Sequence, residues 1–194
     1  MSKHIKTDIE VTYKKRNKAT VFWRGILVFP VAIYVSSFAI NSNAGFAAGF
    51  FVIPALLALV FRERYPSYLL TINHALLELQ TRVVAYALLL TDDYPSIERN
   101  KSISVTFPDI DGGRVLNRWL PLVKWFLAIP LIIVGLVYSI IALFMTFIAW
   151  VLTWSTGKYP KWAGQFVYST IRYWNRVNGY AFLLVSDKYP SFSL

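Results

Sequence analysis

Residues 125–157 read WFLAIPLIIVGLVYSIIALFMTFIAWVLTWSTG and contain no Asp, Glu, Lys, Arg or His. A second uncharged run extends from Gly25 to Phe61, and the polar cluster Asn41–Gly45 divides it into two apolar halves. A membrane-spanning helix needs about 20 apolar residues, so the run of 37 residues suits two spans. The sequence predicts a helical hairpin over residues 22–61. The 33-residue run fits either two short spans that turn near Gly135 or one tilted helix.

The distribution of basic residues favours two spans in each run. The chain of 194 residues is 56% hydrophobic, and its 20 Lys and Arg against 10 Asp and Glu give a net charge of +10. Every basic residue lies before, between or after the two uncharged runs. Because positive loops remain in the cytoplasm, a single second span would export the basic C-terminal segment. We therefore predict four spans, with hairpins over residues 22–61 and 119–155 and with both termini cytoplasmic.

The chain also matches itself at an offset of 94 residues. The segments 9–13 and 103–107 align, and so do the Tyr-Pro pairs at 65–66 and 159–160. Arg82 and Tyr86 align with Arg176 and Tyr180 at the same offset, and Tyr94-Pro95 aligns with Tyr189-Pro190 one residue later. Ordered matches at a fixed period indicate an internal repeat. The sequence predicts two parallel copies, over residues 1–97 and 98–194.

Each copy is expected to carry further elements beside its hairpin. Apolar residues recur at helical spacing in 67–85, and aromatic residues are dense in 161–179, so both segments are predicted to be amphipathic helices in the membrane interface. Short extended segments are expected at 9–13, 86–90, 103–107 and 180–185, paired in a cytoplasmic sheet. The predicted fold class is a mainly α integral membrane protein with two parallel repeats.

The repeated motifs resemble a known family. Arg64-Tyr65-Pro66, then Arg82, Tyr86 and the segment 89–95, are similar to the core signature of the bacterial domain-of-unknown-function family 4389, here in two tandem copies. The resemblance implies a small membrane protein of the bacterial inner membrane, and it implies no catalytic residues. The second copy has Ser186 where the first has Asp92, which places a role for that acidic position in doubt.

Arg82 and Arg176 are the charged residues of most interest. Each stands four residues before a tyrosine, Tyr86 or Tyr180, so the four residues form candidate contacts to a lipid phosphate. Alternatively, each arginine pairs with Asp92, Asp93 or Asp187, or caps a helix. We favour the structural interpretation.

The Tyr-Pro pairs are predicted to serve the architecture of the repeat by marking helix starts and strand ends, because proline fixes its own backbone torsion and disfavours a helix before it. These residues are Tyr65, Pro66, Tyr94, Pro95, Tyr159, Pro160, Tyr189 and Pro190.

Catalytic chemistry is not indicated by the sequence. The chain has no Cys and two His, which leaves few ligands for a metal centre. His74 and Glu78 share a helix face, but we interpret them as a surface pair, and Asp109–Gly113 is interpreted as a turn. We expect no cofactor, no metal site, no enzymatic activity and no nucleic-acid binding.

Two functions remain. The leading prediction is an accessory or scaffold subunit of a bacterial inner-membrane complex, with other membrane proteins or further copies of itself as partners. The alternative is a stand-alone or homo-oligomeric protein that organises the membrane by binding anionic lipids through a basic cytoplasmic face. A channel formed by oligomers ranks third.

Overall fold

The computed structural model describes residues 4–40, 52–96 and 102–194, and it is mainly helical. Its elements in chain order are β1 (Lys6–Ile9), α1 (Lys18–Phe22), α2 (Arg24–Ile40), α3 (Val52–Arg62), α4 (Ser67–Ala87), β2 (Ile103–Thr106), the short 3-10 helix η1 (Asp111–Gly113), α5 (Leu120–Thr156) and α6 (Lys161–Ala181). The helices α4 and α6 occupy the two ranges that the apolar and aromatic patterns predict to be helical.

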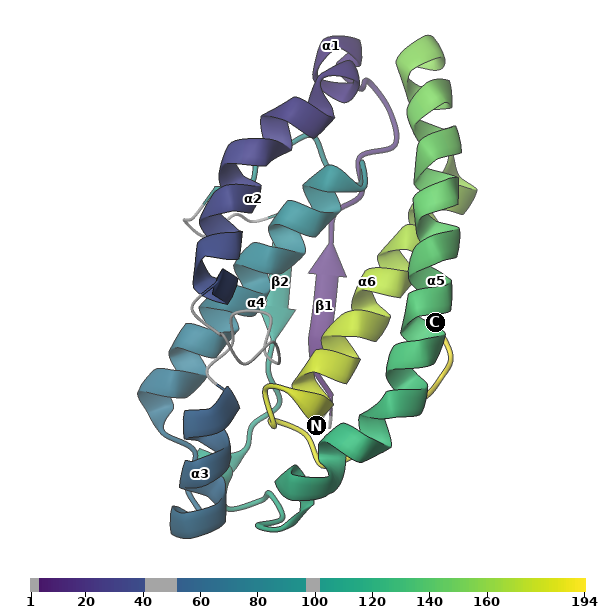
Figure 1. Ribbon diagram of the computed structural model, residues 1–194. Helices are drawn as coiled ribbons and strands as arrows, with labels where there is room; N and C mark the ends of the chain where they lie inside the picture. The colour runs from purple at the N-terminus through teal and green to yellow at the C-terminus, as the bar shows by residue number, and fades with distance from the viewer. Residues whose placement is uncertain (1–3, 41–51, 97–101) are drawn as a thin grey trace.

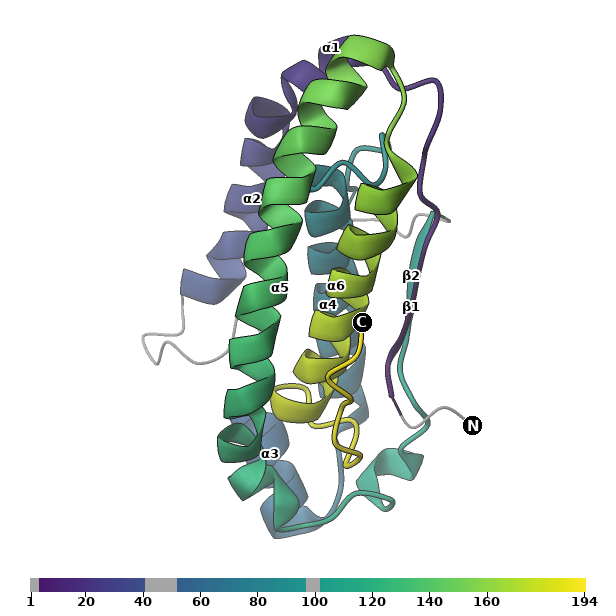
Figure 2. The ribbon, with the colours of Figure 1, turned by 90° about the vertical axis from the view of Figure 1, so that its right-hand side faces the viewer.

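The elements form three layers. Figure 2 shows the two-stranded sheet on one side, α4 and α6 in the middle, and α2 and α5 on the opposite side. The middle helices contact both outer layers, since α6 packs on α5 and β1 while α4 packs on α2 and β2. In Figure 1 the outer layer of helices, formed by α2, α3 and α5, is nearest the viewer, with α2 above α3 on the left and α5 along the right.

The sheet joins the two halves of the chain. β1 and β2 pair antiparallel, and Ile9 lies opposite Ile103, the residue 94 positions further on. Thr81 and Asn175 are also 94 residues apart, and the Asn175 amide donates to the Thr81 hydroxyl at 3.1 Å. This is the register that a two-fold axis between the halves would produce.

The predicted hairpin over residues 119–155 is wrong, because α5 is one unbroken helix of 37 residues. Gly135, taken as a turn, lies inside α5 against α6, where an added Cβ would come within 2.8 Å of the Trp174 ring. The glycine therefore permits a close approach of two helices. By length and composition α5 is the one helix among the described residues that could cross a membrane.

The predicted turn of the first hairpin, Asn41–Gly45, lies outside the described residues. The flanking helices α2 and α3 follow one another along the same side of the molecule (Figure 1) and do not lie side by side as the arms of a hairpin would. Their combined course corresponds to that of α5 on the other side.

Of the four predicted strands, 103–107 is present as β2, 9–13 overlaps β1 only at Ile9, and the other two are absent from the described structure. Segments 86–90 and 180–185 are instead the ends of α4 and α6 followed by tight reversals. Leu89 and Leu184 have φ of 65° and 58°, which turns the chain back onto the last helical turn. The backbone N–H groups of Leu90 and Val185 then donate to Ala85 and Gly179 at 2.8 and 2.9 Å.

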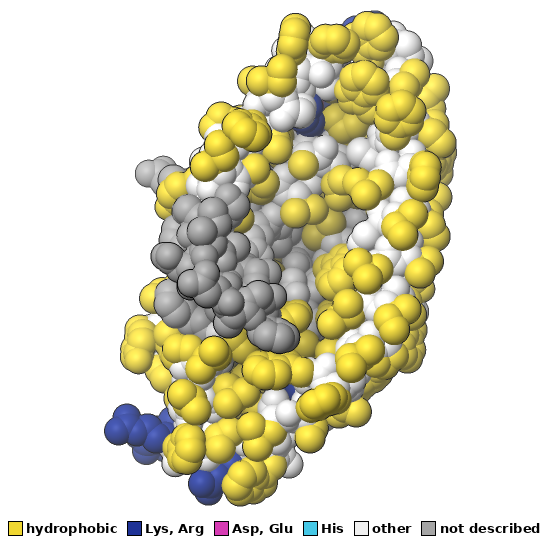
Figure 3. All heavy atoms as spheres, viewed as in Figure 1, with side chains coloured by type: hydrophobic (Ala, Val, Ile, Leu, Met, Phe, Trp, Pro, Cys, Tyr) yellow, Lys and Arg dark blue, Asp and Glu magenta, His cyan; other side chains and the backbone are white. Residues whose placement is uncertain are grey.

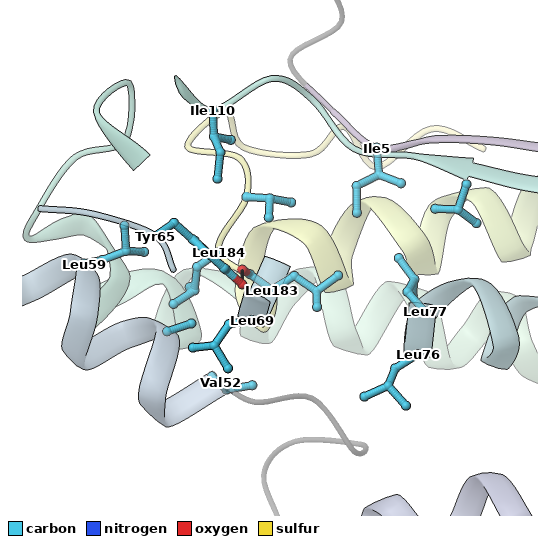
Figure 4. Packing of buried hydrophobic residues seen from close by; sticks show 13 residues of the cluster. Ile5, Val52, Leu59, Tyr65, Leu69, Leu76, Leu77, Ile110, Leu183 and Leu184 are labelled. Carbon is cyan, nitrogen blue, oxygen red and sulfur yellow. Dashed lines mark hydrogen bonds between the residues drawn. The ribbon is translucent and has the colours of Figure 1, made fainter. Parts of the chain in front are cut away.

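The largest cluster of buried hydrophobic side chains unites both halves of the chain. Figure 4 shows Leu59, Tyr65 and Leu69 from the first half close to Leu183 and Leu184 from the second. These side chains are at most 5% exposed. Side chains of both halves therefore pack together in this cluster.

Candidate functional site

The most elaborate polar site lies where α2 begins and α4 ends. Arg24, the first residue of α2, donates to the carbonyl oxygens of Tyr86 and Thr91 at 3.0 and 2.6 Å and to the Asp92 carboxylate. Its guanidinium carbon lies 4.3 Å from the centre of the Tyr86 ring. Arg16 forms a second ion pair with the same Asp92 oxygen at 2.8 Å. One carboxylate thus bridges two buried guanidinium groups.

Burial sets the electrostatics of this first cluster. Removal from water lowers the pKa of Arg16, and the neighbouring Asp92 carboxylate opposes that shift. Burial also raises the pKa of Tyr86, so the phenol stays neutral beside the cations. The site therefore holds two positive charges against one negative charge.

A related cluster lies at the other end of the molecule. The Lys124 ammonium, near the start of α5, donates to the Ser186 carbonyl at 2.8 Å and lies 2.7 Å from the Asp187 carboxylate. It also lies 5.2 Å from the centre of the Tyr180 ring. Tyr180 packs edge-on against Tyr189, as Tyr86 packs against Tyr94 in the first cluster.

The comparison of the clusters corrects the sequence alignment. Asp187 occupies the position of Asp92, so the acidic role is retained although Ser186 aligns with Asp92 in the sequence. The extra residue of the second half lies before the reversal, since Leu184 corresponds to Leu89 at an offset of 95. The same extra residue accounts for the shift of the second Tyr-Pro pair from an offset of 94 to one of 95.

Arg82 and Arg176 do not pair with the aspartates proposed for them. Arg82 pairs with Glu78 at 2.6 Å and donates to the Ser96 carbonyl at 3.1 Å. Arg176 donates to the Ser193 carbonyl at 2.6 Å. Each arginine therefore ties the chain segment after the second Tyr-Pro pair to the preceding helix.

The predicted lipid-contact residues lie inside the protein, with Arg176 less deeply buried than the other three. Arg82, Tyr86 and Tyr180 are 4%, 2% and 1% exposed, and burial lowers the pKa of Arg176. Contact between these groups and a lipid phosphate stays a prediction, and this conformation offers no direct route to it for the buried three.

The first Tyr-Pro pair of each half connects the two halves. Tyr65 donates its hydroxyl to the Leu183 carbonyl at 3.0 Å, and Tyr159 donates to the Leu88 carbonyl at 3.2 Å. Burial raises the pKa of Tyr65 to about 12 and also raises that of Tyr159. Pro66 and Pro160 precede the first residues of α4 and α6, as expected for residues that mark a helix start.

The second Tyr-Pro pair follows each cluster. Tyr94 and Tyr189 are partly exposed and pack on Tyr86 and Tyr180, whereas Pro95 and Pro190 are buried. No strand ends at these positions within the described part of the chain, so their interpretation as strand ends is wrong.

His74 and Glu78 do not form a pair that could exchange protons. The His74 ring contacts the Val105 carbonyl at 2.6 Å, and Glu78 is held by Arg82. Asp109 caps the backbone N–H of Asp111 at the start of η1. The described residues contain no group of three or more His, Cys, Asp or Glu side chains arranged to hold a metal ion.

Sequence reasoning missed Arg16, Asp92 and Lys124 as partners in clusters. Arg24 and Lys124 both stand at the beginning of an apolar run, six residues before Pro30 and Pro130. A cation in that position has a strong need for a buried partner. The basic residue six positions before a proline, repeated at the start of both apolar runs, was therefore the sequence signal for these clusters.

A shallow cavity of about 340 Å³ lies between α4, α5 and α6. Its wall is mostly apolar, with Thr81, Asn175 and Ser139 among the polar lining residues. Figure 3 shows the molecular surface hollowed between α5 and the helices on the left.

Comparison with known proteins gives one match. Residues 119–193 match the family described as Domain of unknown function (DUF4389). The matched segment comprises α5, α6 and the Lys124–Asp187 cluster, so it supports the family resemblance through one copy of the domain. No curated protein and no solved structure matches the chain. The tandem arrangement of two DUF4389 copies stays a prediction.

Proposed function

We propose that this protein is a non-enzymatic scaffold, held in the bacterial inner membrane by its apolar helix layer, and that it serves as an accessory subunit of a larger assembly. The observation that carries the proposal is the surface formed by α2, α3 and α5. Figure 3 shows this face covered by hydrophobic side chains, with Lys and Arg at its ends.

The exposed side chains on this face are large. Phe61, Phe126 and Phe147 are 73%, 72% and 65% exposed, and comparable residues extend along the whole of α5. A soluble monomer rarely exposes a continuous apolar surface of this extent. Lipid or another membrane protein would cover it.

The contacts that the buried basic residues make within the chain support a scaffold function. Arg16, Arg24, Arg82 and Lys124 are all at most 5% exposed and hold carbonyl or carboxylate groups of the same chain. Their contacts close the ends of helices and join distant segments. The two halves, which we propose to be copies of one domain, would thus present their apolar helices on a rigid frame.

The test is extraction of the tagged protein from its native membrane in polymer discs, followed by mass spectrometry of every protein that elutes with it. We expect at least one membrane protein in a fixed ratio. A matched sample in which the tag is carried by an unrelated inner-membrane protein controls for adventitious partners. Elution of the protein without a stoichiometric partner would contradict the accessory role.

The organisation of anionic lipids is a second candidate, favoured by the cations at both ends of the apolar face. Arg64 and Lys158 are exposed and stand 94 residues apart, one near the end of α3 and one just after α5. Each cation near an anionic surface contributes about 1 kcal/mol, so neutralising both should reduce the preference for anionic lipid about 30-fold.

This second candidate is tested by the ratio of anionic to zwitterionic lipid retained by the purified protein. The double variant Arg64→Ala with Lys158→Ala should retain less anionic lipid, and added salt should have the same effect on the unmodified protein. Lys6→Ala, on the outer face of the sheet, is the control. Equal lipid ratios in all three proteins would contradict the candidate.

A further inference from the structure

We infer that α5 lies in the plane of the membrane, so that the whole face formed by α2, α3 and α5 is immersed in one anionic leaflet and the sheet faces water. The inference rests on the proposed membrane embedding and specifies its geometry. It differs from the four-span topology predicted from the charge distribution.

The length of α5 does not decide its orientation. A helix of 37 residues is about 55 Å long, whereas the hydrocarbon core is about 30 Å thick. The central part of α5 could therefore cross the bilayer with both ends in water. The position of the other layers relative to this central part is what distinguishes the two orientations.

A chain of hydrogen bonds places the sheet level with the middle of α5. Tyr173 of α6 donates to the Leu131 carbonyl of α5 at 2.8 Å, and Trp174 donates to the Ser139 hydroxyl at 2.8 Å. The next residue, Asn175, donates to the hydroxyl of Thr7 in β1 at 2.9 Å. Leu131 and Ser139 flank the midpoint of α5, so β1 lies beside that midpoint across the width of α6.

A bilayer perpendicular to α5 would therefore contain the sheet. Lys6 and Asp8 flank Thr7 and are exposed on the outer face of β1. A sheet of two strands also has two open edges, and open edges do not occur in contact with hydrocarbon. Arg172, exposed on α6 next to Tyr173, would reach the same depth. Each of these groups is costly inside a bilayer.

A bilayer parallel to α5 has none of these costs. The sheet and the apolar face are on opposite sides of the α4–α6 layer (Figure 2), so one enters water when the other enters lipid. The residues paired across the halves, Ile9 with Ile103 and Thr81 with Asn175, place the approximate two-fold axis through the sheet and the middle layer. In this orientation both halves contact the leaflet with equivalent surfaces.

The charges at the rim identify the leaflet as the occupant of this face. Arg62, Arg64 and Lys158 are exposed at the two ends of the layer formed by α2, α3 and α5, and Glu63, which lies between the two arginines, is paired with Arg118. No Asp or Glu side chain is visible on the described part of the face in Figure 3. An apolar surface with a cationic rim is complementary to acyl chains beneath anionic headgroups.

The experiment measures membrane depth along α5. The chain has no cysteine, so single spin labels can be introduced at Phe126→Cys, Ile133→Cys, Ile140→Cys and Phe147→Cys, all exposed positions spaced by seven residues. Collision rates with oxygen and with a polar nickel complex report depth for protein reconstituted in vesicles containing anionic phospholipid. Ser104→Cys, exposed on β2, is the matched aqueous control.

We expect the same ratio of oxygen to nickel collisions at all four α5 positions and at least a tenfold lower ratio at Ser104→Cys. A ratio that is highest at Ile133→Cys and Ile140→Cys and falls toward both ends would overturn the inference in favour of a crossing helix. Low collision rates with both reagents at all four positions would overturn it in favour of a protein partner or second copy on this face.

Oriented circular dichroism of the unmodified protein in stacked bilayers gives a result that depends on no variant. We expect the strong 208 nm band of helices that lie parallel to the membrane, and its loss would overturn the inference. Recovery of the protein in the soluble fraction would instead reject the proposed membrane embedding itself, so the two failures are distinguishable.

Discussion

The two cation clusters occupy corresponding places in the two halves and differ in their charge balance. The first joins Arg16 and Arg24 to one carboxylate, Asp92, whereas the second joins the single ammonium of Lys124 to Asp187. Both stack the cation on a tyrosine and bind a carbonyl one residue before the aspartate. The fold therefore requires a buried cation at the start of its apolar helix and tolerates different chemistry around that cation.

Removal of the carboxylate from each cluster should cause the largest losses of stability and should separate the two clusters most clearly. We expect Asp92→Ala to lower the free energy of unfolding by about 3–5 kcal/mol, because two buried guanidinium groups then face each other without a counter-charge. Asp187→Ala should cost less, since an ammonium can lose its proton when it is buried alone, whereas a guanidinium cannot. Thermal unfolding of each variant, followed by circular dichroism in one detergent, measures the difference.

The proton loss also gives the two variants different pH dependence. In Asp187→Ala the unfolded chain binds the Lys124 proton more tightly than the folded chain, so stability should rise as pH increases. Asp92→Ala should show no such rise below pH 10. Exposed Asp93→Ala is the control and should leave stability nearly unchanged. A larger loss from Asp187→Ala than from Asp92→Ala would contradict the account.

Disruption of the close packing of α5 on α6 should produce the next largest loss of stability. An added Cβ at Gly135 would lie 2.8 Å from the Trp174 ring and 3.1 Å from the Tyr173 ring, so Gly135→Ala should destabilise the protein by about 1–3 kcal/mol. Gly25→Ala in α2 is the matched control, because nothing lies within 4 Å of its added Cβ. Thermal unfolding of the two variants under the same conditions checks this, and equal midpoints would count against the packing described.

Removal of the paired tyrosine hydroxyls should lower stability by a smaller amount, and Tyr65→Phe should cost more than Tyr159→Phe. Each variant removes one hydrogen bond between the halves, which contributes about 1 kcal/mol, and Tyr65→Phe also removes the bond that the Tyr65 hydroxyl accepts from the Asn73 amide at 3.0 Å. The pKa of Tyr65 is raised to about 12, so in the unmodified protein its contribution is fully present below pH 10 and is lost as pH rises toward 12. Tyr65→Phe should weaken that alkaline loss, as measured by unfolding at a series of pH values. A greater loss of stability from Tyr159→Phe than from Tyr65→Phe would contradict this order.

The exposed ion pair between Arg118 and Glu63 should matter least. Its side chains are 41% and 63% exposed at a separation of 2.8 Å, and pairs of this kind contribute at most about 1 kcal/mol. Arg118→Ala should therefore shift the unfolding midpoint less than the aspartate, glycine and tyrosine test variants above, and high salt should remove the shift. A shift as large as that of Asp187→Ala would refute the distinction between buried and exposed pairs.

The sequence predicted the local elements better than their tertiary partners. Helical spacing marks α4 and α6, and the offset of 94 residues aligns Ile9 with the residue that it faces in the sheet. The course of α5 was not predictable from charge, because Gly135 has the same sequence signature in a turn and at a close helix contact.

The tertiary contacts of the candidate site were likewise not predictable from the sequence. Arg82 and Arg176 stood out because both lie in similar sequence contexts. The i,i+4 spacing of Glu78 and Arg82 does indicate their ion pair, but the carbonyls of Ser96 and Ser193 that the two arginines also bind carry no sequence signal. The bridge from Arg16 to Asp92 joins residues 76 positions apart, a distance at which one sequence alone does not report contact.

We expect the two halves of the chain to join about a two-fold axis into one frame beneath the apolar face. The most direct test is the double variant Ile9→Cys with Ile103→Cys, which places two sulfurs at facing positions of an antiparallel pair. The account predicts rapid formation of a disulfide within one chain under mild oxidation, and little in Lys6→Cys with Ile103→Cys, where the register is shifted. Absence of the first crosslink, or equal yields from both pairs, would contradict the account.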